Sequence, residues 1–198
     1  NESSGKQGIE IANSLSRLGV KTTLILGPTN NTPDSNVKLI KIVSADEMFE
    51  QVKKILPVDI AICSAAVSDM KPSIINKTKL KKNLYDTKNI KLSENPDILD
   101  FLGKTNKDRP KLVVGFSAET ENIIKNSEKK LKNKHCDYII ANDVTKKEIG
   151  FNSDYNEVTI IDKFGGKTKI KKNKKSYIAS LIAETIINKL LADGKNFN

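Results

Sequence analysis

The sequence predicts an α/β protein with a Rossmann-like three-layer fold, a mostly parallel sheet covered by helices on both faces, and a small C-terminal hairpin. Two observations predict this fold. Short apolar, β-branched runs alternate along the 198 residues with segments whose apolar residues recur at helical spacing. Some of the runs are continuously apolar, as parallel strands buried on both faces must be. Because no repeat or linker divides the chain, residues 1–198 are expected to form a single domain.

The first third of the chain alternates helix and strand. Residues 9–18 carry apolar side chains at helical spacing, and Gly19 is the expected stop. Ser44 and Glu47 form a capping box that predicts a helix over residues 45–56. The apolar runs between these helices and after them predict strands at residues 21–26, 37–43 and 58–63.

The middle of the chain changes character. Residues 70–88 are lysine-rich, contain Pro72 and show no clear period, which indicates a flexible, basic flap. Asn95 is expected to cap a helix that has Pro96 at its first position and ends near residue 102.

The remaining elements restore the alternation. Residues 164–166 read Phe-Gly-Gly and predict the turn of a hairpin between strands 158–162 and 167–171. Further helices are expected at residues 121–132 and 176–191, and further strands at residues 90–92, 112–116 and 138–141.

Composition restricts the class of protein. An apolar content of 37% with 29% charged residues is typical of a globular protein in water. No apolar run approaches the roughly 20 residues of a membrane helix. Cys63 and Cys136 are too few for a disulfide framework or a zinc site, so the reducing cytoplasm is the expected location.

The formal charge of +10 raises nucleic acid as a partner. The lysines are spread over the chain, however, and almost no aromatic residues are interleaved with them as stacking platforms. A solvated lysine surface with one local site for an anionic substrate is the favoured interpretation. A non-catalytic basic module that binds nucleic acid remains an alternative. So does an NAD(P)-dependent oxidoreductase, although the chain lacks a G-x-G-x-x-G loop.

The loop at residues 1–8 is the first candidate site. Its sequence, NESSGKQG, opens directly onto a helix, and Ser4 and Gly5 leave backbone N–H groups uncovered. A helix N-terminus with uncovered N–H groups favours a phosphate, although such turns are often only caps. Because a phosphate loop of this type follows a strand, we expect the first strand of the sheet to precede residue 1.

Further candidates follow the predicted strands. Ligands of a doubly wound sheet gather at the carboxyl ends of its strands, so the loops after residues 63, 116 and 141 are expected to share one site. Ala65 and Ala66 allow close approach of a base or sugar, and Asp69 can accept a ribose hydroxyl or help to hold Mg²⁺. Helix packing by the alanines, a cap role for Asp69 and a core role for Phe116 are the structural alternatives.

Seven segments in a fixed order resemble the phosphopantothenate–cysteine ligase family, the synthetase domain of the bacterial bifunctional coenzyme A biosynthesis protein. They are NESSGKQG (1–8), AAVSD (65–69), KLKK (79–82), NPDI (95–98), GFSAET (115–120), ANDV (141–144) and GFNSD (150–154). The resemblance implies a ligase that joins 4′-phosphopantothenate to L-cysteine through an acyl-cytidylate, using CTP and Mg²⁺. It also implies a homodimer, and a flavin-dependent decarboxylase domain fused ahead of the chain.

The resemblance also assigns residues. It implies that Lys79 closes over the triphosphate and that Asn1 helps to convert the acyl-nucleotide to product. The choice of CTP over ATP rests on the resemblance alone. A contribution of the hairpin at residues 157–171 to the dimer interface is a further hypothesis. The residues expected to hold the nucleotide are Ser4, Gly5, Ser64, Ala65, Ala66, Asp69, Lys79, Asn95, Pro96, Asp97, Ile98, Phe116, Lys130 and Lys134.

One tempting pair is set aside. His135 is the only histidine and precedes Cys136, which suggests a Cys–His nucleophile. Adjacent residues point in different directions, and no acid is placed to orient the imidazole. A thiol mechanism is therefore not expected.

Overall fold

The computed structural model describes residues 3–74, 89–143 and 153–192. Its helices are α1 Lys6–Arg17, α2 Ala45–Ile55, α3 Ile98–Lys104, α4 Ile123–Asn133 and α5 Lys175–Ala192. Its strands are β1 Thr23–Leu26, β2 Lys38–Lys41, β3 Ile60–Cys63, β4 Met70–Pro72, β5 Leu92–Glu94, β6 Leu112–Glu119, β7 Tyr138–Asp143, β8 Tyr155–Asp162 and β9 Lys167–Lys174. The alternation predicted from the sequence is confirmed, with shifts of a few residues at the element ends.

The central sheet has the order β3-β6-β7-β8-β9. Strands β3, β6 and β7 are parallel, whereas β8 and β9 join the same sheet antiparallel. The Rossmann-like α/β fold is confirmed, and the predicted hairpin is present, with Asp162 N–H donating to Gly166 O over 3.0 Å across its turn. The sheet is mixed rather than mostly parallel because this hairpin extends its edge.

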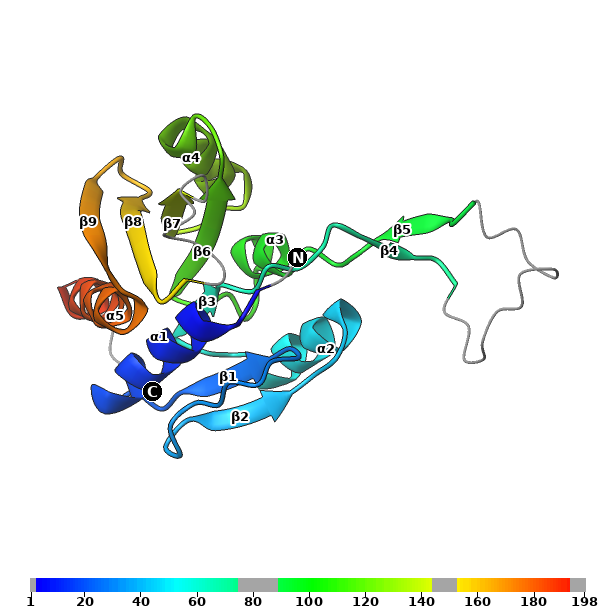
Figure 1. Ribbon diagram of the computed structural model, residues 1–198, viewed down its shortest axis with the longest axis horizontal. Coiled ribbons are helices and arrows are strands. Elements are labelled where there is room, and N and C mark those ends of the chain that lie inside the picture. The colour runs from blue at the N-terminus through cyan, green and yellow to red at the C-terminus, as the bar shows by residue number, and fades with distance from the viewer. Residues whose placement is uncertain (1–2, 75–88, 144–152, 193–198) are drawn as a thin grey trace.

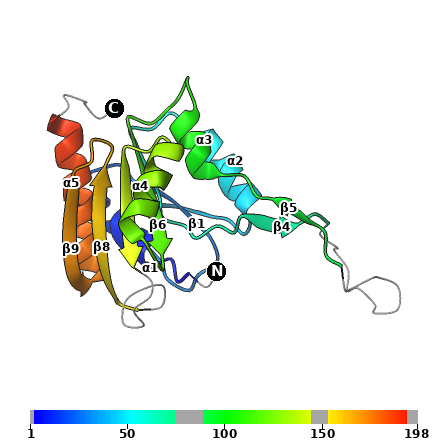
Figure 2. The ribbon, with the colours of Figure 1, turned by 90° about the horizontal axis from the view of Figure 1, so that it is seen from above.

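Two smaller strand pairs lie outside the central sheet (Figures 1 and 2). Strands β1 and β2 pair in parallel beside α1 and α2. Strands β4 and β5 pair antiparallel and form an arm that projects from the body (Figure 1). The arm corrects part of the predicted flap, because Met70–Pro72 is a strand. Residues 75–88 of that flap, Lys79 included, lie outside the described residues.

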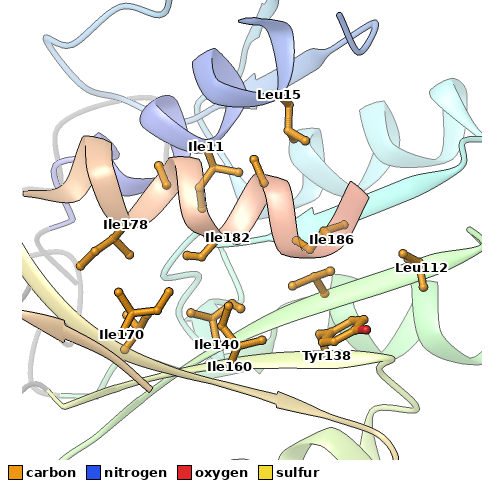
Figure 3. Packing of buried hydrophobic residues seen from close by; sticks show 14 of the residues in the cluster. Ile11, Leu15, Leu112, Tyr138, Ile140, Ile160, Ile170, Ile178, Ile182 and Ile186 are labelled. Atoms are coloured by element: carbon orange, nitrogen blue, oxygen red, sulfur yellow. The ribbon is translucent and has the colours of Figure 1, made fainter. Parts of the chain in front are cut away.

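The core has two halves, one on each face of the central sheet. Alternate residues of a strand point to opposite faces, so Val114 and Ile140 pack against α1 and α5, while Val113 and Ile139 pack against α3 and α4. Figure 3 shows Ile178, Ile182 and Ile186 of α5 facing the sheet. All seven of these side chains have exposed fractions of 0%. The sheet is thus covered on both faces, as the three-layer prediction requires. No helix in residues 3–74, 89–143 or 153–192 has the length and apolar character needed to cross a bilayer.

The predicted cap of α2 is confirmed. Ser44 Oγ accepts from Glu47 N–H at 3.2 Å, and Glu47 Oε2 accepts from Val43 N–H at 2.8 Å, one residue before the cap. Ser44→Ala is expected to lower the free energy of unfolding by about 1 kcal/mol, because an orphan N–H of the first turn loses its partner. Urea denaturation measures this loss, and Ser44→Asp, which retains a cap, is the control. Equal losses in both variants would contradict the cap role.

The predicted start of α3 is wrong. Asp97, not Asn95, is the N-cap, and its side chain accepts from Asp100 N–H at 2.9 Å. Asn95 N–H instead donates to Asp69 O at 2.8 Å, and Asn95 Nδ2 donates to Ser68 O at 2.8 Å. The reason is that the hydrogen bonding between the two sides of the arm continues to Asn95, so Asn95 pairs with the loop after β3 instead of opening the helix. The helix therefore starts only after Pro96.

Candidate functional site

One cavity of about 2290 Å³ gathers the candidate residues. It is lined by every nucleotide-site candidate that the structure describes. These are Ser4, Gly5, Ser64, Ala65, Ala66, Asp69, Asn95, Pro96, Asp97, Ile98, Phe116, Lys130 and Lys134. Asn1 and Lys79 lie outside the described residues, so their positions stay predictions. The roles of the gathered residues also stay predictions at this point.

The convergence has a topological cause. Strands β3, β6 and β7 are parallel neighbours, so their carboxyl ends meet at one edge of the sheet. Ser64 follows β3, Phe116 lies in the second half of β6, and Asn142 lies near the end of β7. All three line the cavity. The expectation that these chain segments share one place is confirmed.

The loop before α1 closes one side of the cavity. Gly5 adopts a φ of 69°, a left-handed conformation that a side chain disfavours. Thr29 Oγ1 and Asn31 Nδ2 both donate to Ser4 O, at 2.8 and 2.9 Å, and hold the loop against the segment after β1. Since Gly5 offers no capping side chain, the N-terminus of α1 presents backbone N–H groups and the positive end of its dipole.

A cluster of charged residues, Asp97, Lys130 and Lys134, also lines the cavity. Lys134 Nζ lies 2.7 Å from Asp97 Oδ2 and 3.6 Å from Asp100 Oδ1. Lys130 Nζ donates to Phe116 O at 2.8 Å. Lys130 lies on α4, and Lys134 is the C-cap residue of that helix. The ammonium group of Lys130 is thus placed beside Phe116, the aromatic candidate, whereas that of Lys134 lies against the start of α3.

The ion pair in this cluster fixes the charge state of its members. Desolvation alone would raise the pKa of Asp97, but hydrogen bonds from Lys134 and from Asp100 N–H outweigh it and lower that pKa below its usual value. The hydrogen bond to Asp97 in turn raises the pKa of Lys134, against desolvation. Both groups are therefore charged at neutral pH, and Asp97 holds the Lys134 ammonium in place at the cavity.

Asp69 and the paired alanines form the remaining wall. Ser68 Oγ donates to Met70 O at 3.0 Å, and the Asn95 amide holds Ser68 O from the arm. The loop after β3 is thus tied to the base of the β4–β5 arm. Asp69 and Ala65 are exposed, so their surfaces are accessible from solvent. The exposed carboxylate of Asp69 caps none of the helices in residues 3–74, 89–143 and 153–192, which argues against that structural alternative.

The sequence analysis did not identify a second group of polar residues that line the cavity, Lys6, Asn142 and Lys175. Lys175 is only 4% exposed, although it ends a run of lysines that is typical of a solvated strand. Desolvation, and then the charge of Lys6, lower the pKa of Lys175. Lys6 forms an ion pair with Asp154. Asn142 Oδ1 is buried and has no hydrogen-bond partner among the described residues. Only tertiary packing places these side chains, so no local pattern indicated them.

The cysteines do not form a nucleophilic site. Cys136 is 4% exposed, and desolvation raises its pKa to about 12. His135 is exposed and adopts a φ of 52°. We expect Cys136 to resist iodoacetamide at pH 8 in the folded protein, because the thiolate is the reactive form. Mass spectrometry of the alkylated protein measures this. Rapid alkylation of Cys136 before unfolding would contradict the expectation.

Protein ligands for a metal are sparse here. Within residues 3–74, 89–143 and 153–192, no three His, Cys, Asp or Glu side chains are grouped so as to hold an ion. Mg²⁺ in nucleotide sites is commonly held by phosphates, waters and one or two carboxylates. The exposed carboxylate of Asp69 on the cavity wall fits that donor set.

The chain matches curated relatives over most of its length. The coenzyme A biosynthesis bifunctional protein CoaBC of Borreliella burgdorferi is 39% identical over 188 residues, which cover 94% of this chain and 47% of the relative. The protein of the same name from Bacillus subtilis is 37% identical over 172 residues, which cover 86% and 42%. A protein named cysteine/cysteine sulfinic acid decarboxylase is 36% identical over 189 residues, covering 94% and 52%. The chain thus spans about half the length of these relatives.

A solved structure has a similar fold. The C-terminal domain of a coenzyme A biosynthesis bifunctional protein CoaBC superposes with a TM-score of 0.79 at 33% identity, covering 96% of this chain and 85% of that one. The family model for the DNA/pantothenate metabolism flavoprotein C-terminal domain matches residues 1–190. The match includes all of the candidate residues that line the cavity, and nearly the whole fold. The chain therefore belongs to the family of the DNA/pantothenate metabolism flavoprotein C-terminal domain.

Proposed function

We propose that the chain is a phosphopantothenate–cysteine ligase that uses CTP. The observation that supports it most is the gathering of the separate sequence motifs around one cavity, which Lys130, Lys134 and the first residues of α1 all line. These sources of positive charge suit a reaction that brings a triphosphate together with a phosphorylated carboxylate. The relatives named for coenzyme A biosynthesis support the same reaction class.

In the first half-reaction, a carboxylate oxygen of 4′-phosphopantothenate attacks the α-phosphorus of CTP. The P–O bond to the β-phosphate breaks, pyrophosphate leaves, and an acyl-cytidylate forms. Two anions must approach each other, so the task of the protein is orientation and charge neutralisation. Lys130 and Lys134 supply fixed positive charge, and Lys79 is assigned to close over the triphosphate by its place in the KLKK motif.

In the second half-reaction, the amine of L-cysteine attacks the acyl carbon. The bond from that carbon to the CMP oxygen breaks, the amine loses a proton, and an amide and CMP result. Asn1 is assigned to this step by its place in the NESSGKQG motif, and a neutral amide could hydrogen-bond the acyl carbonyl without adding charge. Mg²⁺, held by the nucleotide phosphates with Asp69 as a protein ligand, would neutralise phosphate charge.

The proposal includes a homodimer. The projecting arm carries Met70, Ile74, Ile90 and Leu92, whose exposed fractions are 43%, 71%, 70% and 55%. Burial of such side chains by a second copy would stabilise a dimer. The arm suits this role better than the hairpin, because β9 is a lysine-rich edge whose charges would repel a copy of themselves.

Light scattering of two variants separates these interfaces. Ile90→Asp on the arm is expected to give monomers, whereas Phe164→Asp in the hairpin turn is expected to leave the dimer intact. Phe164 is a matched control because it is also an apolar residue with a high exposed fraction, 78%. A dimer that survives Ile90→Asp and dissociates with Phe164→Asp would favour the hairpin instead.

Pyrophosphate release tests the reaction. The purified protein with Mg²⁺ and CTP is expected to release pyrophosphate only when 4′-phosphopantothenate is added, and to form the amide only when cysteine follows. ATP in place of CTP tests the nucleotide choice. Binding of NADH without any response to CTP would favour an oxidoreductase. Salt-dependent binding of DNA, again without a response to CTP, would favour a nucleic-acid module.

A further inference from the structure

Polar side chains from four elements line a part of the cavity that the proposed roles leave unused. They are Lys6, Gln7, Asn142, Asn156 and Lys175, and we call them the polar corner. The Gln7 side chain ties three of the elements together, because its Nε2 donates to Lys175 O at 3.4 Å and its Oε1 accepts from Asn156 Nδ2 at 3.2 Å. The first turn of α1, the start of β8 and the start of α5 therefore meet here.

The sheet places Asn142 beside this meeting point. Asn142 of β7 pairs with Val158 of β8, and Asn156 lies two residues from Val158, on the same face of the sheet. Val158 and Ile140 belong to the half of the core that packs against α1 and α5. Asn142 and Asn156 are therefore diagonal neighbours that both face the layer of α1 and α5.

The burial of Lys175 favours an anionic ligand. Lys175 is 4% exposed, although lysine is almost never fully buried unless it is paired. Desolvation by burial and the charge of Lys6 lower its pKa more than the carboxylate of Asp154 raises it. Asp154 is itself exposed and forms an ion pair with Lys6. The surroundings of Lys175 thus disfavour its charged form, and a bound anion would offset that effect.

Asn142 has the opposite need, for a hydrogen-bond donor. Its Oδ1 is buried, yet no described residue donates a hydrogen bond to it. Buried acceptors in folded proteins nearly always have a donor. A phosphate dianion would offer Lys175 a partner but would leave Asn142 Oδ1 without one. A ligand that carries both an anionic group and an N–H donor meets both needs.

We propose that the polar corner binds the L-cysteine substrate, with its α-carboxylate at Lys175 Nζ and its α-amine donating to Asn142 Oδ1. An α-amino acid carries these two groups on one carbon, so they lie a short and fixed distance apart. The identity of the amino acid rests on the proposed function, in which cysteine is the amine substrate. The contacts themselves require only the carboxylate and the amine.

The position suits the second half-reaction. Lys6 and Gln7 belong to the same NESSGKQG motif that assigns Asn1 to the acyl-nucleotide. An amine held at the polar corner would therefore lie close to that intermediate. The positive charges of Lys6 and Lys175 also disfavour the ammonium form of the bound amine, so the nucleophilic –NH₂ form is favoured.

A comparison of L-cysteine with cysteamine, which has the amine and the thiol but no carboxylate, tests the contact to Lys175. Lys175→Met is expected to lower kcat/KM for cysteine by about tenfold to a hundredfold, and for cysteamine by less than about threefold. Lys175→Arg should recover part of the preference for cysteine. Lys174→Met is the matched control and should change neither value, because Lys174 is exposed and does not line the cavity. Equal losses with both amines in Lys175→Met would overturn the proposal, since they would indicate a structural role.

Asn142→Leu should give a different pattern. Both amines lose the acceptor, so amide formation from cysteine and from cysteamine is expected to fall by about tenfold or more. Formation of the acyl-cytidylate, trapped with hydroxylamine, should keep its rate. A rate of trapping that falls together with the rate of amide formation would overturn the contact between Asn142 and the amine.

A binding measurement separates failure of this inference from failure of the proposed function. If the wild-type protein yields no trapped acyl-cytidylate, the proposed ligase is wrong. L-cysteine is then titrated into the protein in a reducing buffer, and the side-chain amide of Asn142 is followed by NMR. A saturable shift that is absent in Lys175→Met would support an amino-acid site at the polar corner. No shift in the wild-type protein would overturn it.

Discussion

Lys134→Ala is expected to lower kcat/KM for CTP by about a hundredfold. Lys134 lines the cavity, and its ammonium is held by Asp97 at the end of the cavity that Phe116 and Lys130 also line. A fixed positive charge should stabilise the transition state most, because negative charge shifts toward the leaving pyrophosphate as it is displaced. Helix α3 should remain capped, because Asp97 accepts from Asp100 N–H independently of the lysine. Steady-state kinetics at varied CTP measures the change.

Two matched variants distinguish a specific role of Lys134 from an effect of net surface charge. Lys132→Ala removes a charge from the same helix at an exposed residue that does not line the cavity, so kcat/KM should change less than about twofold. Lys134→Arg retains the charge and should recover part of the lost activity. If Lys132→Ala and Lys134→Ala have equal effects, the activity depends on net surface charge, and the assigned contact is wrong.

Asp137→Asn is expected to lower the free energy of unfolding by about 2 kcal/mol. The Asp137 side chain is 3% exposed. Its oxygens lie 2.7 Å from Lys163 Nζ, 3.0 Å from Arg109 Nη2 and 2.9 Å from Val113 N. It thus links the hairpin turn, the segment before β6 and the start of β7. The asparagine amide has the same shape as the carboxylate but cannot balance the charges of Lys163 and Arg109. Because these two cations are partly exposed to water, the loss of stability is expected to be limited.

The stability difference should depend on pH. Desolvation alone would raise the pKa of Asp137, but hydrogen bonds from Lys163, Val113 N–H and Arg109 outweigh it and hold the pKa below its usual value. The stabilisation is therefore complete above the unfolded pKa of about 3.9, and is lost as pH falls through the lower folded pKa. Urea unfolding of both proteins should show the full difference at pH 7 and a shrinking one below about pH 4.

A surface pair is the control for Asp137. Asp34 pairs with Arg17 at 2.7 Å, but these side chains are 42% and 61% exposed. Asp34→Asn should therefore cost less than about 1 kcal/mol at pH 7. A loss for Asp137→Asn no larger than that for Asp34→Asn would show that the buried carboxylate contributes nothing beyond an ordinary surface ion pair.

Much of the fold follows from local pattern. Helix α2 was predicted to within one residue because Ser44 and Glu47 mark its start and the apolar spacing marks its length. The hairpin follows from its Phe-Gly-Gly turn. Strand β6 runs three residues beyond its predicted end, to Glu119, because its pairing with β7 continues there. Strand pairing is a tertiary effect that the apolar run, ending at Phe116, does not reveal.

The candidate site, like the fold, could be predicted from the sequence only in part. Topology alone predicted that the segments after residues 63, 116 and 141 would share one site, and Ser64, Ser117 and Asn142, which directly follow those residues, line the same cavity. The assignment of Lys130 and Lys134 came from the resemblance, since both look like ordinary surface lysines in sequence. Lys175 and Asn142 escaped notice because burial, not residue type, distinguishes them. The false cap at Asn95 arose because Asp97, two residues later, offers an equally good cap.

Isotope transfer tests the proposed acyl-cytidylate most directly. 4′-Phosphopantothenate labelled with ¹⁸O in its carboxylate is incubated with the protein, CTP, Mg²⁺ and cysteine, and the products are analysed by mass spectrometry. Attack on the α-phosphorus followed by cleavage of the acyl C–O bond predicts that one ¹⁸O appears in CMP and none in pyrophosphate. Label in inorganic phosphate together with CDP, or unlabelled CMP alongside the amide, would contradict the acyl-cytidylate.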